Sequence, residues 1–148
     1  MPGLGVEFSS TGRPLSHYKR QEAELIRNYR DLLVWQKAMD LVVESYRIAA
    51  LLPKSETYGL ASQIQRSAVS IPANIAEGHG RDHLGDYLRH LSIANGSLME
   101  LETLFLLLIR LSFFPACELE SALELSTEIS KMLAGLTRSL KRTSNTRT

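Results

Sequence analysis

The chain has 148 residues, of which 44% are hydrophobic and 22% charged, as is typical of a single soluble globular domain. The net charge is +1, so no overall field draws the protein to nucleic acid or to anionic lipid, and a polyanion would have to meet a local basic patch. The lone cysteine, Cys117, excludes an internal disulfide and suits a reducing cytoplasm.

Residues 1–29 are rich in glycine, serine, proline and charge and show little periodicity, which predicts a flexible leader before a bundle domain at 30–141. They lack the apolar run of a secretory signal. The most apolar stretch, Leu104 to Leu111, is interrupted by Arg110 and is much shorter than the roughly 20 residues that span a bilayer. We therefore expect a soluble cytoplasmic protein without a membrane partner.

A first helix is expected over residues 32–52, because apolar side chains recur there at steps of three and four. Pro53 ends it, since proline cannot continue the hydrogen-bond ladder. The face predicted to be buried carries Trp35, Ala38, Met39, Val42, Tyr46 and Ala49.

A second helix is expected over residues 56–77, with Ser55 as its N-cap and Gly78 and Gly80 at its end. Pro72 lies inside it and should kink it near Ala68, whose carbonyl loses its donor. The predicted apolar stripe consists of Leu60, Ile64, Ala68, Ile71 and Ile75.

The third expected helix, residues 83–111, has the clearest pattern, because two sets of apolar residues repeat every seven positions. These sets are Leu84, Leu91, Leu98 and Phe105, and Tyr87, Ala94, Leu101 and Leu108. A fourth helix is expected over residues 116–141, followed by a frayed polar tail at 142–148. Its stripe consists of Leu119, Ala122, Ser126, Ile129, Leu133, Leu136 and Leu140.

The expected connections are about four to six residues long, so successive helices should lie antiparallel. No segment favours a strand. The sequence therefore predicts an all-α fold, an antiparallel up-down four-helix bundle.

The third helix has more apolar surface than one bundle core can cover, because residues 104–109 are all apolar. We expect the remainder to contact another subunit through Leu104, Leu107, Ile109 and Leu111. The alternative is that the leader folds over this surface.

The sequence carries no motif of an enzyme, so we expect no catalytic activity, no cofactor and no small-molecule substrate. Cys117 lies at the start of the fourth helix, but no histidine is near it in sequence, and a free cysteine is usually a small core residue. Potential metal ligands gather around one turn, without the spacing of an established metal motif, and a solvated helix start is the simpler interpretation. They are His79, Asp82, His83, Asp86 and His90.

Four basic residues are candidates for contact with nucleic acid. Arg66 lies in the second helix, Arg81 in the glycine-rich turn, Arg89 in the third helix and Lys37 in the first. A ring of subunits would repeat each of them and create a positive surface that could bind phosphates without reading sequence. Taken singly, each is more simply explained as a solvated surface charge.

Two segments, YGLASQIQRSAVSIPANIAEGHGR (Tyr58–Arg81) and YLRHLSIANGSLMELET (Tyr87–Thr103), resemble the four helix bundle protein family, also called 23S rRNA-intervening sequence or S23-type proteins. The opening YRDLLVWQKAMDL fits as well, so the resemblance extends from about Tyr29 to Lys141. It implies small cytoplasmic bundles that assemble as homopentameric rings, with no established enzymatic activity. A related branch of retroelement accessory proteins is thought to bind nucleic acid.

The motif residues also have local interpretations. Asn74 could satisfy a backbone group freed by Pro72, and Gly96 could let a neighbouring helix approach closely. Glu100 or Glu102 could pair with Arg66 or Arg81, which would make these arginines architectural.

Gln65 and Asn95 stand where family members often carry a basic residue, which weakens the nucleic-acid interpretation. Two hypotheses remain: an oligomer associated with RNA or single-stranded nucleic acid, or a protein-interaction scaffold without such contact.

Overall fold

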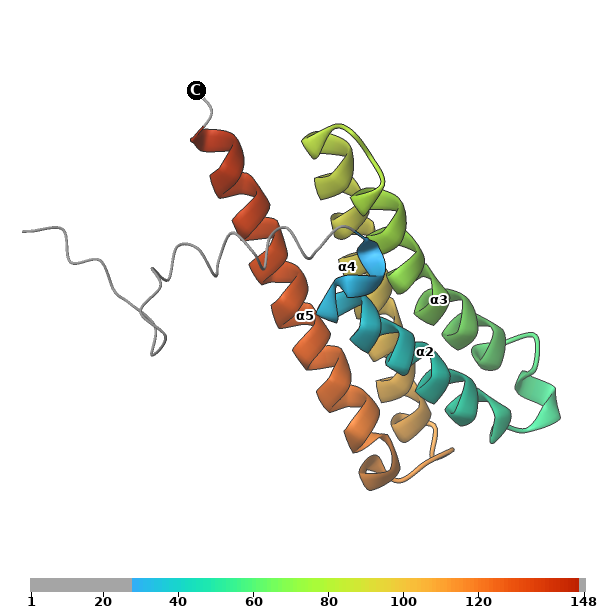
Figure 1. The fold of residues 1–148 in the computed structure, drawn as a ribbon. Coiled ribbons are helices and arrows are strands. Elements are labelled where there is room, and N and C mark those ends of the chain that lie inside the picture. The colour runs from blue at the N-terminus through green and yellow to red at the C-terminus, as the bar shows by residue number, and fades with distance from the viewer. Residues whose placement is uncertain (1–27, 147–148) are drawn as a thin grey trace, which may run out of the picture.

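The computed structural model describes residues 28–146, which form four long helices and two single-turn 3-10 helices, with no strand among them (Figure 1). The long helices are α2 (Leu33–Ala50), α3 (Leu60–His79), α4 (Leu84–Arg110) and α5 (Ala116–Asn145). The 3-10 turns are η1 (Tyr29–Asp31) and η2 (Lys54–Glu56). Successive long helices run antiparallel, which confirms the predicted all-α bundle. The expected leader lies almost wholly outside the described residues.

The heptad pattern of α4 places its apolar seam in the bundle core, as predicted. Leu91, Leu98, Leu101 and Phe105 are all buried and belong to the same hydrophobic core as the isoleucines of α3. The stripes of α3 and α5 are likewise buried or packed against the core. Helices α3 and α4 form the most extensive interhelical contact, and α4 and α5 a smaller one.

The predicted face of α2 is only partly right. The buried residues are Val34, Ala38, Leu41, Ser45, Ile48 and Ala49. Met39 and Tyr46, expected inside, are exposed, and Trp35 and Val42 lie at the margin of the core. Apolar side chains cover more than half of this helix, so spacing alone fits two overlapping faces, and packing against α3 and α5 selects one.

Helix α3 begins four residues later than predicted, and Ser55 does not cap it. Ser55 lies in η2, and the N-cap residue is Gly59. Glu56 performs the capping instead, because its Oε2 accepts a hydrogen bond from the Leu60 amide at 3.3 Å. The last helix continues to Asn145, four residues beyond the predicted boundary.

Helix α4 is long and apolar enough to cross a membrane by length and composition alone. The prediction missed this because it considered only the stretch from Leu104 to Leu111, which is too short to span a bilayer. A helix that lies in the middle of a globular bundle passes the same test, because it is apolar on more than one side. Eight residues of α4 are buried inside the bundle.

Candidate functional site on the α3 and α4 pair

Two of the four predicted basic residues form ion pairs within the subunit, and two do not. Lys37 pairs with Glu128 of α5 at 2.7 Å, and Arg81 pairs with Glu77 one helical turn before it, also at 2.7 Å. Arg66 and Arg89 are exposed and form no ion pair among the described residues. Two of the four therefore remain free to meet an anion, one on α3 and one on α4.

The pairing expected between these arginines and α4 is not formed. Arg81, just after the end of α3, pairs with Glu77 of that helix, and neither Glu100 nor Glu102 forms an ion pair with a described residue. The geometry explains the choice, since a carboxylate four positions before an arginine on a helix is already within reach.

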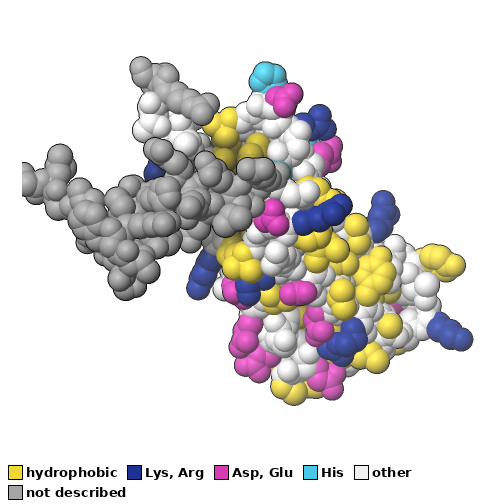
Figure 2. All heavy atoms as spheres, viewed as in Figure 1, with side chains coloured by type: hydrophobic (Ala, Val, Ile, Leu, Met, Phe, Trp, Pro, Cys, Tyr) yellow, Lys and Arg dark blue, Asp and Glu magenta, His cyan; other side chains and the backbone are white. Residues whose placement is uncertain are grey.

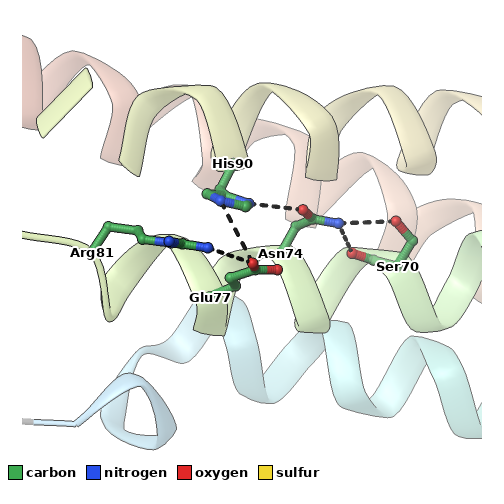
Figure 3. A network of polar contacts seen from close by, with 5 residues as sticks. All are labelled: Ser70, Asn74, Glu77, Arg81 and His90. Carbon is green, nitrogen blue, oxygen red and sulfur yellow. Dashed lines mark hydrogen bonds and ion pairs between the residues drawn. The ribbon is translucent and has the colours of Figure 1, made fainter. Parts of the chain in front are cut away.

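A chain of polar side chains joins α3 to α4 at the motif residues (Figure 3). The Asn74 side-chain amide donates to the Ser70 carbonyl at 2.8 Å and to the Ser70 hydroxyl at 3.0 Å. The Ser70 hydroxyl lies 2.7 Å from that of Ser97 on α4. On its other side, the Asn74 Oδ1 lies 3.0 Å from Nδ1 of His90. Asn74 thus connects the two helices, but it does not donate to Ala68, the carbonyl that Pro72 leaves without a donor.

His90 is the most buried titratable residue of this network, with 5% of its surface exposed. Because the Asn74 amide nitrogen is committed to Ser70, its Oδ1 must be the acceptor and the histidine Nδ1 the donor. The other ring nitrogen, Nε2, is buried without a hydrogen bond and lies 3.9 Å from Glu77 Oε1. His90 is therefore held in place between α3 and α4 by its hydrogen bond to Asn74.

Gly78 explains why the two helices come so close at this point. A Cβ added there would lie 2.8 Å from the His90 Cβ and 2.9 Å from the Tyr87 ring. No larger residue fits without moving α4. Burial also raises the pKa of the Tyr87 hydroxyl. The "SIPANIAEG" motif is thus accounted for by packing of α3 on α4.

Gly96 does not have the role predicted for it within the bundle. A Cβ built at this position meets no atom within 4 Å, so no helix of the same subunit requires a glycine there. Gly96 is exposed, unlike Gly78.

The potential metal ligands do not assemble. Among the described residues, no group of three or more histidine, cysteine, aspartate or glutamate side chains could hold a metal ion. His90 points into the network, and His79 makes an edge contact with the Tyr87 ring at 5.9 Å. Cys117 lies at the start of α5, as predicted, but it is exposed and does not pack in the core as a free cysteine usually does.

The predicted interface residues of α4 separate into three groups. Leu104 is only 4% exposed and belongs to the core of its own subunit, so it offers no surface to a partner. Ile109 is half-buried against the core. Leu107 and Leu111 are 39% and 56% exposed and share one side of the helix by their spacing.

A second apolar surface lies on the outer side of α2 and α3, where sequence reasoning had not placed one. Met39, Val43 and Tyr46 of α2 and Val69 of α3 are exposed there, and apolar side chains gather over these helices in Figure 2. Their spacing of three and four on α2 was visible in the sequence. It was missed because Met39 and Tyr46 had been assigned to the core.

Comparisons with known proteins agree with this architecture. The family model described as 23S rRNA-intervening sequence protein matches residues 30–135. A solved structure from Bacteroides thetaiotaomicron, described as a protein with unknown function from the S23 ribosomal protein family, is 30% identical to the chain. It superposes with a TM-score of 0.67 over 71% of this chain and 98% of its own. No curated protein matches.

Proposed function

Because the chain belongs to the 23S rRNA-intervening sequence protein family, we propose that it is a non-enzymatic, self-associating bundle that contacts nucleic acid through Arg66 and Arg89. Neither the family description nor that of the solved neighbour names an enzyme. We expect the protein in the cytoplasm, and the resemblance implies a homopentameric ring.

One observation carries the proposal: Arg66 and Arg89 are the two predicted basic residues that no carboxylate among the described residues neutralises. An arginine already held by a carboxylate gains less from a phosphate, because the existing pair must first be broken. Arg66 also lies three residues before Val69, at the edge of the exposed apolar surface of α2 and α3. Self-association through that surface would bring arginines of neighbouring copies together.

The test is RNA binding at low and at moderate salt, with single-stranded RNA of mixed sequence as the probe. Phosphate contacts release counterions, so binding should weaken steeply as salt rises. Arg66→Gln/Arg89→Gln should lower the affinity about tenfold or more. The matched control is Lys37→Gln/Arg81→Gln, which removes two equal charges that are already paired. An equal loss in both double variants, or no complex at low salt, would contradict the proposal.

A protein-interaction scaffold is the second candidate, and the ion pairs favour it. Lys37 and Arg81 are both engaged within the subunit, and the net charge is only +1. A pull-down that recovers one protein partner equally well before and after nuclease treatment would support this alternative.

A further inference from the structure

The charged residues in the second half of α5 are all basic. Residues 129–145 contain no aspartate or glutamate, and their exposed basic residues are Lys131, Arg138, Lys141 and Arg142. None of the four forms an ion pair with a described residue. The helix dipole favours cations in the last turn, but Lys131 and Arg138 lie one turn or more before it. The dipole therefore does not account for this run of positive charge.

A groove of about 520 Å³ lies between this half of α5 and the first half of α4, where the two helices diverge (Figure 1). Its floor is apolar and closed, because Leu91 and Leu133 are only 1% and 2% exposed. Of the described residues that line the groove, none is a carboxylate and none is aromatic. The polar residues that line it are Ser92, Asn95, Ser130, Thr137, Arg138 and Lys141.

Arg89, one of the two free arginines of the proposed function, lies beside this groove. It precedes the groove residue Ser92 by three positions on α4, so both side chains start from the same side of the helix. Because α4 and α5 run antiparallel, the start of α4 lies beside the end of α5. The groove therefore has cations on both of its helices, with Arg89 at the edge of α4 and Arg138 and Lys141 on α5.

The nearest carboxylates do not neutralise these cations. Glu102 of α4 and Glu124 of α5 lie roughly 9–11 Å along the helix axis from the nearest groove residue of the same helix. Asp86 and Glu128 are closer, but each is two positions from a groove residue and so points to another side of its helix. Glu128 is also held by Lys37. The groove is thus a locally positive site in a chain whose net charge is only +1.

We propose that single-stranded RNA that contacts Arg89 continues along this groove, with its phosphates bound by Arg138 and Lys141. The inference rests on the proposed function and names the surface that the strand follows. The polar side chains of the groove are of the types that contact nucleic-acid backbones, since Arg and Lys neutralise phosphates and Ser, Thr and Asn bind phosphate oxygens. The cations from Lys131 to Lys141 extend over about 15 Å of α5, so they follow the strand rather than one phosphate.

An acidic peptide helix is the other anionic partner that a groove between helices could bind. Such recognition depends on apolar surface that the peptide buries. Leu91 and Leu133 have almost no surface left to bury, and Leu88 alone is a half-buried leucine of the groove. Charge and hydrogen bonding must therefore supply most of the affinity, which favours a phosphate backbone. Since no described aromatic side chain is present for bases to stack on, the groove should bind RNA without sequence preference.

The first test compares two double variants of the full-length chain that lose equal charge. Arg138→Gln/Lys141→Gln removes two groove cations. Lys54→Gln/Arg110→Gln is the matched control, because these residues are exposed in η2 and at the far end of α4 and form no ion pair with a described residue.

The groove variant should bind mixed-sequence single-stranded RNA about tenfold more weakly than the wild-type chain. Its slope of log affinity against log salt should be smaller by about 1.4, the value for two lost phosphate contacts on a single strand. The control should change the affinity by about twofold or less, because salt screens distant charges. Equal losses in the two variants would overturn the inference, since net charge alone would then explain them.

The same titrations separate this inference from the proposed function. RNA binding that is weakened by Arg66→Gln/Arg89→Gln but not by the groove variant would overturn the inference and leave the proposed function standing. A wild-type chain that forms no complex would contradict both. Polyglutamate is the acidic-peptide probe. If its binding depends on Arg138 and Lys141 while that of RNA does not, the groove takes an acidic peptide and the inference is wrong.

A second test locates the strand. In a Cys117→Ser background, the thiol introduced by Asn95→Cys should react with a maleimide in the free protein and several-fold more slowly at saturating RNA. The control is the thiol introduced by Ser55→Cys in η2, which should react equally with and without RNA. Unchanged reactivity in the groove would overturn the inference, and so would a groove thiol that fails to react even in the absence of RNA.

Discussion

Helix α4 has two neighbours that it contacts in different ways. On α3 it packs tightly, with Gly78 against Tyr87 and His90 and with a continuous polar network through Asn74. Beside α5 it leaves an open groove of about 520 Å³, whose lining includes Asn95, Arg138 and Lys141. Neither of these two cations forms an ion pair with a described residue. The motif that identifies the family thus lies mainly at the α3–α4 contact, where it is explained by architecture. The α4–α5 contact leaves exposed surface that the packing of the bundle does not use.

The largest effect should come from a methyl group at the tight contact. Gly78→Ala places a Cβ 2.8 Å from that of His90, which forces α3 and α4 apart. We expect a loss of about 2–3 kcal/mol in the free energy of unfolding, as for overpacked cores. Denaturant unfolding followed by circular dichroism measures it.

The matched control is Gly96→Ala on the exposed side of α4. Because nothing lies near the new Cβ, the substitution should raise the free energy of unfolding by about 0.5–1 kcal/mol through helix propensity. Equal effects at the two glycines would show that the α3–α4 contact is not as close as the structure has it.

The second effect concerns the polar network. Asn74→Ala removes the acceptor of the His90 Nδ1 hydrogen and the donor to Ser70. Leaving a buried histidine nitrogen unpaired should lower the free energy of unfolding by about 1–3 kcal/mol. The comparison variant is Asn95→Ala, in the groove between α4 and α5. This substitution should change the free energy of unfolding by about 0.5 kcal/mol or less. A harmless Asn74→Ala would mean that the network contributes no stability.

The sequence predicted the fold well because its main signals are local. The heptads in α4 and Gly80 at the end of α3 are recognised from residues a few positions apart, whereas Gly78, expected to end α3, lies inside it. The Glu77–Arg81 pair could have been found from local spacing in the same way. The Lys37–Glu128 pair could not, because it joins α2 to α5 across the bundle. The same limit explains Leu104: six consecutive apolar residues do not reveal which of them face the core. The surface sites could not be predicted from the sequence, because which side chains stay exposed depends on how all four helices pack.

The smallest expected effect is on the pH dependence of stability, which tests the burial of Tyr87 at the α3–α4 contact. Burial raises the pKa of the Tyr87 hydroxyl above its usual value near 10. At a pH above 10, the unfolded chain therefore releases this proton while the folded chain retains it. The folded state binds more protons in that range, so stability falls as pH rises from the unfolded pKa toward the folded one. Below pH 10 the contribution is fully present.

Tyr87→Phe should remove this share of the alkaline destabilisation and leave a shallower decline of melting temperature above about pH 10. The matched control is Tyr46→Phe, because Tyr46 is exposed on α2 and takes no part in the α3–α4 contact. The melting profile of this control should follow that of the wild-type chain. If both variants change the dependence of melting temperature on pH alike, the alkaline effect does not come from burial of Tyr87. The Tyr87 side chain would then be more accessible to solvent than the structure shows.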